Sequence, residues 1–213
     1  MMVVSNGLAL PIFLMPNGIS HGAAGIAYAL LRLYAVTQNK AYLEAACEGI
    51  AYEQSVFSPV AANWPDLRDF AQQNGQPGFM VSWCHGATGI GLARLGGLSI
   101  LATDEIYQDV EVALQTTQKH SLQDADCVCC GNFGRIEMLL VAAEKLSRSE
   151  LREAAEKRAA WGVLRAEQVG GYQFPNLPNS VFSPSFFQGT SGIGYELLRL
   201  AHSEVLPSLL LWE

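Results

Sequence analysis

Two short motifs of the sequence carry the side chains best suited to binding a metal. Cys84 lies in Ser-Trp-Cys-His-Gly, and Cys129 and Cys130 lie in Cys-Cys-Gly. Three thiolates form a soft ligand set that favours zinc over magnesium, calcium or manganese. Three protein ligands also leave the fourth position of a tetrahedral zinc ion open, as catalytic zinc sites do. We therefore predict that Cys84, Cys129 and Cys130 bind one catalytic Zn²⁺ ion.

The cysteine usage of the whole chain favours a metal site over a disulfide framework. The chain has five cysteines, an odd number, and its N-terminus lacks the basic start and cleavage site of a signal peptide. We therefore expect a cytoplasmic protein, in which thiols stay reduced. Cys127 is expected to be a spare thiol beside the ligands, and Cys47 a core residue. The competing interpretation is that all these cysteines only pack inside a helical core.

An internal repeat surrounds the metal-binding motifs. Four segments share a Gly-x-x-Gly motif followed by an apolar run. Their first glycines are Gly22, Gly86, Gly131 and Gly189, and the residues directly before these glycines are His21, His85, Cys130 and Gln188. Between the apolar runs lie more polar stretches with helical periodicity, at residues 40–55, 104–119 and 149–169.

Each repeat is predicted to be a pair of helices, the apolar one inside and the polar one outside. Concentric inner and outer helices give an all-α fold, an α/α toroid or part of one. Glycines at the start of the inner helices permit close approach of the backbone. The loops before these helices should therefore lie at one end of the ring. There His21, His85, Cys130 and Gln188 would converge on a single mouth.

The composition excludes several classes of function. Half of the residues are hydrophobic and only 15% are charged, which suits helices covered on more than one side. The net charge of −7 argues against nucleic-acid binding, which needs clustered basic residues. No stretch reaches the roughly 18 apolar residues of a membrane helix, so we expect no membrane insertion. We find no interdomain linker and expect residues 1–213 to form a single domain.

Together the four motifs resemble the lanthionine synthetase C-like family. They are most similar to the C-terminal cyclase domain of class II, bifunctional lanthipeptide synthetases, from about residue 16 onward. The final Leu-Pro-Ser-Leu-Leu-Leu-Trp-Glu is also similar to the end of those enzymes. The residues that carry the resemblance are Gly-Ile-Ser-His21-Gly, Trp-Cys84-His85-Gly, Cys129-Cys130-Gly and Gly189-Thr-Ser-Gly-Ile-Gly.

The resemblance implies a ring of seven helix-pair repeats around a zinc ion. In the family, zinc binds a cysteine thiol of a dehydrated precursor peptide, and the thiol adds to dehydroalanine or dehydrobutyrine to form a thioether (lanthionine) ring. Carried onto this sequence, Cys84, Cys129 and Cys130 are the zinc ligands. His21 matches the histidine that handles protons during ring closure, and its ordinary pKa of about 6.5 suits that role.

Other residues near the motifs are open to two interpretations. His85 follows a ligand and faces the same mouth, so it either assists proton transfer and orients the peptide or forms a structural hydrogen bond. Trp83 and Phe133 either line the peptide groove or pack.

The sequence also departs from the family pattern. It has about four of the seven repeats. No residue matches the aspartate that the family carries upstream; Asp66 stands in a different context, and we expect it to be a loop residue. Met80 stands where some relatives carry an arginine.

These departures leave several interpretations open. In the first, the chain is an active cyclase, either as a fragment of a larger polypeptide or together with a second chain that supplies the missing repeats. In the second, it is an inactive cyclase-derived module that binds zinc and peptides. A carbohydrate-active toroid is disfavoured, because such enzymes need paired carboxylates at the mouth.

Overall fold

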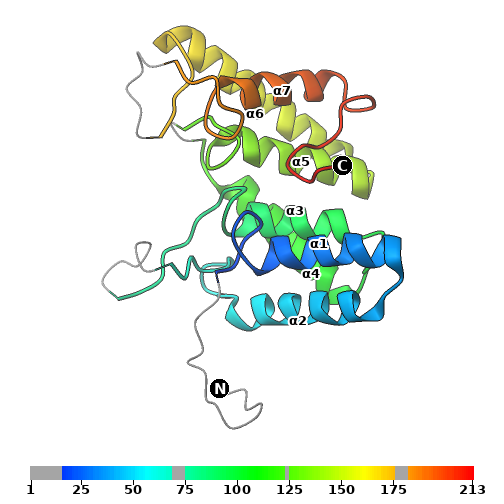
Figure 1. The fold of residues 1–213 in the computed structure, drawn as a ribbon. Coiled ribbons are helices and arrows are strands. Elements are labelled where there is room, and N and C mark those ends of the chain that lie inside the picture. The colour runs from blue at the N-terminus through cyan, green and yellow to red at the C-terminus, as the bar shows by residue number, and fades with distance from the viewer. Residues whose placement is uncertain (1–15, 69–74, 123–124, 176–181) are drawn as a thin grey trace.

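The computed structural model describes residues 16–68, 75–122, 125–175 and 182–213. Within these ranges the regular secondary structure is entirely helical, and three isolated β-bridges are the only extended pairings. The helices, shown in Figure 1, are α1 (Ala23–Thr37), α2 (Lys40–Val56), α3 (Ala87–Gly97), α4 (Asp104–Lys119), α5 (Asn132–Leu146), α6 (Ser149–Val169) and α7 (Thr190–Ala201). The predicted all-α fold is confirmed.

The three polar stretches of the sequence form the helices α2, α4 and α6. The bounds of α4 and α6 are those predicted, and α2 ends one residue later than predicted, at Val56. Side-chain caps fix where α2 and α4 begin. At the start of α4 the side chain of Thr103 accepts a hydrogen bond from the amide of Ile106 at 3.4 Å, and two acidic residues in the first turn favour the helix dipole.

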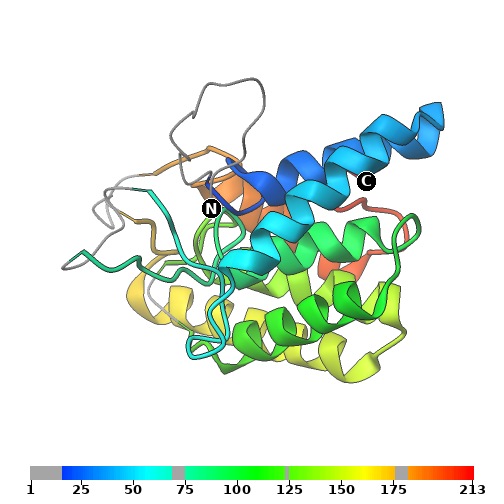
Figure 2. The same ribbon diagram turned by 90° about the horizontal axis from the view of Figure 1, so that it is seen from below.

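The apolar runs form an inner arc, which consists of α1, α3, α5 and α7. Each of the first three packs against the polar helix that follows it, and neighbouring members of the arc pack on one another. Every residue of α3 is buried, whereas α1 and α7 are buried on only one face. Helices α3 and α5 therefore form the middle of the arc, while α4 and α6 run along the side away from α1 (Figure 2).

Helices α1, α5 and α7 begin with the same tight turn, and α3 begins with a variant of it in which Gly86 has a φ of +78°. The first amide of α1, that of Ala23, donates to the carbonyl of Pro16 at 3.0 Å, and the first amide of α7, that of Thr190, donates to the carbonyl of Ser183 at 2.8 Å. A Cβ atom on the second glycine of each motif would lie 1.9–2.1 Å from the carbonyl oxygen six residues earlier, so only glycine fits. These second glycines are Gly25, Gly89, Gly134 and Gly192.

The shared turn places the four loops before the inner helices at one end of the molecule (Figure 1, left). Hydrogen bonds join these loops in chain order. The hydroxyl of Ser20 donates to the carbonyl of Cys84 at 3.3 Å, the amide of Cys84 to the carbonyl of Cys129 at 3.2 Å, and the amide of Cys129 to the carbonyl of Phe187 at 2.9 Å. The prediction that the motifs share one mouth is confirmed.

Two expectations need correction. Cys47, expected in the core, is exposed, because it lies on the side of α2 that faces solvent while its neighbour Ala46 is fully buried. The fourth repeat lacks its outer helix in the described part of the chain, since residues 202–213 follow α7 without forming a helix. No helix among the described residues is long and apolar enough to cross a membrane.

Candidate functional site

Four cysteine thiols from two neighbouring loops lie together at the mouth. Cys84 belongs to the loop before α3, and the other members of this thiol cluster, Cys127, Cys129 and Cys130, belong to the loop before α5. The sulfur of Cys127 lies 3.7 Å from that of Cys130, and the thiol of Cys129 interacts with those of both Cys84 and Cys130. The structure thus brings together the three cysteines that the sequence predicts as ligands, with Cys127 beside them.

These contacts move the thiol pKa values in opposite directions. Hydrogen bonding from Cys129 outweighs the effect of burial and lowers the pKa of Cys84 to about 5. Hydrogen bonding from Cys127 and Cys129 lowers the pKa of Cys130 to about 3. The pKa of Cys129 is raised, because its thiol interacts with Cys130 and Cys84 and is itself buried. These shifts favour the thiolate form at Cys84 and Cys130 and the protonated form at Cys129.

The chemistry of this donor set fits zinc. Thiolates are soft ligands, and Cys84 and Cys130 already favour the anionic form that binds a metal. Within the described residues, however, no group of three or more His, Cys, Asp or Glu side chains has the arrangement of a metal site. Ligation of zinc by Cys84, Cys129 and Cys130 therefore remains a prediction.

Two imidazole rings border the thiol cluster. The centroids of the His21 and His85 rings are 6.1 Å apart, and the ring planes are tilted by 44°. His21 is exposed, whereas His85 is 1% exposed and neither of its ring nitrogens has a hydrogen-bond partner among the described residues. The imidazole of His85 nevertheless interacts with the neighbouring thiol of Cys84 and helps to lower the pKa of that thiol.

Asp66 is a member of the site that the sequence did not reveal. Its side chain is 1% exposed and accepts hydrogen bonds from the guanidinium of Arg68 at 2.8 and 2.5 Å. Burial opposes the ionisation of Asp66, but the hydrogen bonds from Arg68 and the nearby charge of His85 prevail and lower its pKa. Asp66 lies in the loop between α2 and α3, as expected, but it is buried and ion-paired near His85.

Arg68 was also missed, because it lies 16 residues before Cys84 in the sequence. Its guanidinium lies 3.6 Å from the sulfur of Met80, which occupies the position where some relatives carry an arginine. The hydrogen bonds that Arg68 donates to Asp66 raise the pKa of its guanidinium most, and the negative charge of Cys84 adds to this effect. A cation is thus supplied to the thiol cluster from a different position in the chain.

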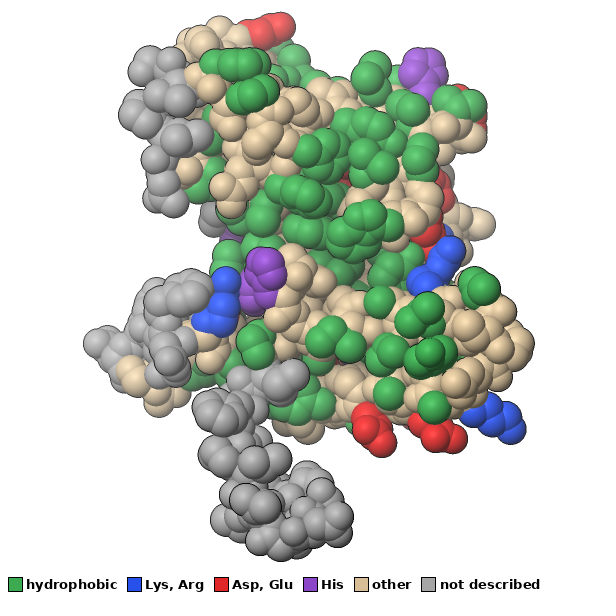
Figure 3. Space-filling view, in the orientation of Figure 1, with side chains coloured by type: hydrophobic (Ala, Val, Ile, Leu, Met, Phe, Trp, Pro, Cys, Tyr) green, Lys and Arg blue, Asp and Glu red, His purple; other side chains and the backbone are tan. Residues whose placement is uncertain are grey.

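Two cavities open at the mouth. The thiol-side cavity has a volume of about 480 Å³, and its lining includes His21, Trp83, Cys129, Phe187, Gln188 and Trp212. The α1 cavity has a volume of about 830 Å³ and extends along α1, where its lining includes Ile26, Leu33 and Val36. The two cavities share Ser20, His21 and Trp212. Hydrophobic side chains gather on this face between α1 and α7 (Figure 3).

Aromatic rings form the floor of the thiol-side cavity. Trp83 stacks on Phe187, with the ring centroids 5.0 Å apart, and lies 6.2 Å from Trp212. Of the two aromatic residues considered from the sequence, Trp83 lines the cavity. Phe133 is fully buried and makes an edge contact with Tyr172, so it packs.

Comparison with known proteins agrees with this architecture. The family model described as "Lanthionine synthetase C-like protein" matches residues 15–211. The chain is 25% identical over 190 residues to the lacticin 481/lactococcin biosynthesis protein LcnDR2 of Lactococcus lactis subsp. lactis, which covers 84% of this chain and 20% of that protein. The solved structure of nisin cyclase superposes with a TM-score of 0.71 at 20% identity and covers 92% of this chain and 50% of that one.

These matches define both the extent and the family of the chain. It spans about half the length of nisin cyclase and a fifth of the Lactococcus protein. The structural likeness shows that the inner arc and its outer helices are part of an α/α toroid. Because the family match covers nearly the whole chain, the chain belongs to the lanthionine synthetase C-like family.

Proposed function

We propose that the chain is the zinc-bearing part of a lanthipeptide cyclase, which adds peptide cysteine thiolates to dehydroalanine or dehydrobutyrine. The observation that supports this most directly is the convergence of Cys84, Cys129 and Cys130 with His21 at one mouth of a cyclase-like toroid. The substrate would be a dehydrated precursor peptide. The free thiols of the cluster favour a reducing compartment, and we propose a cytoplasmic location.

In this proposal the three cysteines would hold Zn²⁺, which would supply a lowered pKa to the substrate thiol so that the thiol reacts as a thiolate. The substrate sulfur forms a bond to the β-carbon of the dehydro residue, and the electron pair of the C=C bond moves to give an enolate. The enolate takes up a proton at its α-carbon. His21 is placed to donate this proton, because its exposed imidazole lines the same cavity as Cys129.

His85 and Arg68 have supporting roles in the proposal. His85 is buried next to Cys84 and interacts with its thiol, so it is placed to orient the peptide or to assist proton transfer. The guanidinium of Arg68 favours the anionic state of the neighbouring thiols. Both residues lie in the segment between α2 and α3, which also carries Cys84.

The test uses a synthetic peptide with one dehydroalanine and one cysteine. Ring closure does not change the peptide mass but consumes its thiol, so alkylation by N-ethylmaleimide followed by mass spectrometry counts the unreacted peptide. We expect the zinc-loaded chain to protect the thiol faster than the peptide closes alone. His21→Ala should slow this reaction by about 10²–10⁴-fold, as expected for loss of a general acid, without loss of zinc.

A second candidate function is a non-catalytic module that binds zinc and thiol peptides. It is the alternative to the first proposal because the chain spans only 50% of nisin cyclase. A second chain that supplies the remaining helices would restore activity under the first proposal. Zinc binding without thiol protection, both alone and with such a chain, would establish the second candidate.

A further inference from the structure

One thiol of the cluster has no task in the proposed function. Cys127 is fully buried, yet its sulfur lies 3.7 Å from that of Cys130, which is half-buried. Cys130 is one of the three proposed zinc ligands, together with Cys84 and Cys129. With zinc held by those three, Cys127 alone of the four thiols in the cluster would stay free, in contact with a ligand.

The backbone holds the sulfurs of Cys127 and Cys130 close together. The two residues belong to one turn, in which the amide of Gly131 donates to the carbonyl of Cys127 at 2.9 Å. A disulfide requires a sulfur–sulfur distance of about 2.05 Å. Because the two sulfurs are already in contact, rotation of their side chains within the turn would close this distance without moving a helix.

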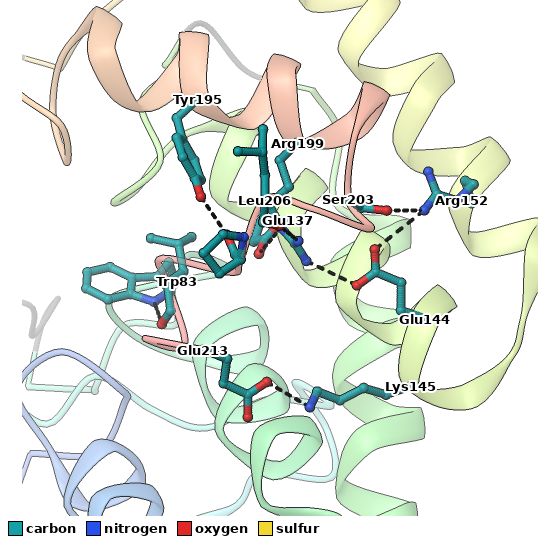
Figure 4. Close-up of polar contacts among 12 residues, drawn as sticks. Trp83, Glu137, Glu144, Lys145, Arg152, Tyr195, Arg199, Ser203, Leu206 and Glu213 are labelled. Carbon is teal, nitrogen blue, oxygen red and sulfur yellow. Dashed lines mark hydrogen bonds and ion pairs between the residues drawn. The ribbon is translucent and has the colours of Figure 1, made fainter.

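The access of small molecules to Cys130 comes from the mouth and not from an open edge of the arc. Helix α5, which follows the thiol-bearing loop, packs against α3 on one side and α7 on the other. Figure 4 shows how Arg199 of α7 is bonded to Glu137 and Glu144 of α5, at 3.0 and 3.2 Å. The loop before α5 is in turn hydrogen-bonded to the loops before α3 and α7. Its exposure is therefore set by neighbours that belong to the chain itself.

The different exposures of the two thiols define an order of reaction with a hydroperoxide, which reaches Cys130 but not the fully buried Cys127. Attack of the Cys130 thiolate on hydrogen peroxide forms an S–O bond and breaks the O–O bond, giving a sulfenic acid and hydroxide. The sulfur of Cys127 then attacks that of Cys130, so that an S–S bond forms and the S–O bond breaks. The departing hydroxide takes up the proton of Cys127. In total, two thiols are oxidised to a disulfide and one peroxide is reduced to two waters.

We propose that Cys127 and Cys130 are a site of reversible oxidation, at which a hydroperoxide converts a zinc ligand and its buried neighbour into a disulfide. The disulfide would take Cys130 out of the ligand set, so that zinc leaves until a reductant restores the thiols. The release of zinc rests on the proposed function, whereas formation of the disulfide does not. Pairing with Cys127 also keeps Cys130 from the sulfinic and sulfonic states, which thiol reductants do not reverse.

The first test locates the disulfide in the metal-free chain. Cys47, which is exposed on α2, is replaced by serine throughout to prevent crosslinks between chains, and four of the five cysteines remain. After treatment with hydrogen peroxide, free thiols are blocked with N-ethylmaleimide, disulfides are reduced, and the released thiols are labelled with iodoacetamide. Thiols blocked in the first step should fall from four to two, and the second label should be on Cys127 and Cys130. Both lie in one tryptic peptide with Cys129, so fragmentation by mass spectrometry assigns the label.

Two further substitutions in the Cys47→Ser chain test which thiols pair. Cys84→Ser should leave the disulfide unchanged, whereas Cys127→Ser should abolish it. Cys127→Ala provides a second replacement at this buried position, and circular dichroism checks that each variant keeps its helices. A disulfide that persists without Cys127, or a Cys47→Ser chain in which Cys127 and Cys130 carry no second label, overturns the inference.

The second test follows zinc in the zinc-loaded Cys47→Ser chain, treated with hydrogen peroxide in the presence of a chromogenic chelator. We expect zinc to be released in step with the disulfide, and the chain to bind zinc fully again after reduction. Without Cys127, Cys130 has no thiol with which to pair and is oxidised further. The chain that also carries Cys127→Ser should therefore recover much less of its zinc binding after reduction.

These measurements distinguish failure of this inference from failure of the proposed function. A chain that binds no zinc before oxidation refutes the proposed function, while a disulfide between Cys127 and Cys130 in the metal-free chain still supports the oxidation site. A chain that binds zinc but forms no such disulfide refutes the inference and leaves the proposed function standing. If the disulfide forms while zinc stays bound, the link between oxidation and the metal is refuted.

Discussion

At the scale of single residues, two thiols in contact differ in their access to the mouth. Cys127 is fully buried, whereas Cys130 is half-buried directly before the first glycine of its motif. We therefore predict that Cys127→Ser still binds about one zinc ion, while Cys130→Ser loses most of it. Inductively coupled plasma mass spectrometry after dialysis against zinc and a reductant measures this. Loss of zinc in Cys127→Ser with retention in Cys130→Ser would show that Cys127, and not Cys130, is the zinc ligand.

Asp66 links stability to pH at the same scale. Its pKa is lowered in the folded chain, so its ionised form stabilises the fold above its ordinary pKa, and this contribution is lost as the pH falls through the lowered value. Asp66→Asn should reduce the unfolding free energy at pH 7 by about 1–3 kcal/mol, because Arg68 loses its buried partner.

Urea denaturation at pH 7 and at pH 3 tests the role of Asp66. The difference between Asp66→Asn and the wild type should shrink at the lower pH. Glu150, whose ion pair with Arg148 is exposed, provides the control, and Glu150→Gln should have little effect at either pH. An equal loss at both pH values would show that the charge of Asp66 is not what stabilises the fold.

The residues that sequence alone identified are those whose type and local spacing carry the chemistry. Cys84, Cys129 and Cys130 stand in motifs that the repeat aligns, so their meeting at one mouth followed from local patterns. Asp66 and Trp212 were missed for a different reason. Asp66 bonds to Arg68 only two residues away, but its burial beside His85 depends on tertiary packing. The position of Trp212 depends on such packing too, and no local pattern encodes it.

At the scale of the helices, the two glycines of the last inner helix provide a matched pair of substitutions. A Cβ at Gly192 would lie 2.1 Å from the carbonyl oxygen of Phe186, whereas a Cβ at Gly194 would meet no atom within 4 Å. We expect Gly192→Ala to lower the unfolding free energy by about 1–3 kcal/mol through overpacking. Gly194→Ala should raise it by about 0.5–1 kcal/mol through higher helix propensity.

Urea denaturation followed by circular dichroism measures both glycine variants. Equal effects of the two substitutions would show that the tight turn before α7 is not required for its stability.

The helices themselves were predictable to the extent that their signals are local. The periodicity of α4 and α6 sufficed to locate both ends, because capping residues and apolar spacing lie within the helix or next to it. The fourth repeat behaved differently. Residues 202–213 form no outer helix after α7. The path of residues 207–213 depends instead on distant contacts, such as the hydrogen bond from the phenol of Tyr28 to the carbonyl of Leu211, which is 183 residues later in the chain.

At the scale of the whole molecule, a zinc ion would join loops that belong to different repeats. Cys84 and Cys130 precede different inner helices, so metal binding should couple the stabilities of two halves of the arc. A ligand that binds only the folded chain stabilises it by about 2.7 kcal/mol at about 100 times its Kd. We predict a gain of this size on adding zinc, and no gain in Cys84→Ser.

Urea denaturation with zinc and with a chelator measures this gain. The reducing agent and the protein concentration must be the same in both arms. An identical zinc response in Cys84→Ser would show that the ion binds elsewhere in the chain.

The similar turns of the four loops before the inner helices have a consequence for how such a protein can evolve. Closely related turns present an imidazole at His21 and His85, a thiol at Cys130 and an amide at Gln188, all directly before a glycine. The chemistry of each position is therefore independent of the turn that carries it. A reactive centre assembled in this way can be gained, altered or lost by single substitutions, while the helices that support it are inherited unchanged.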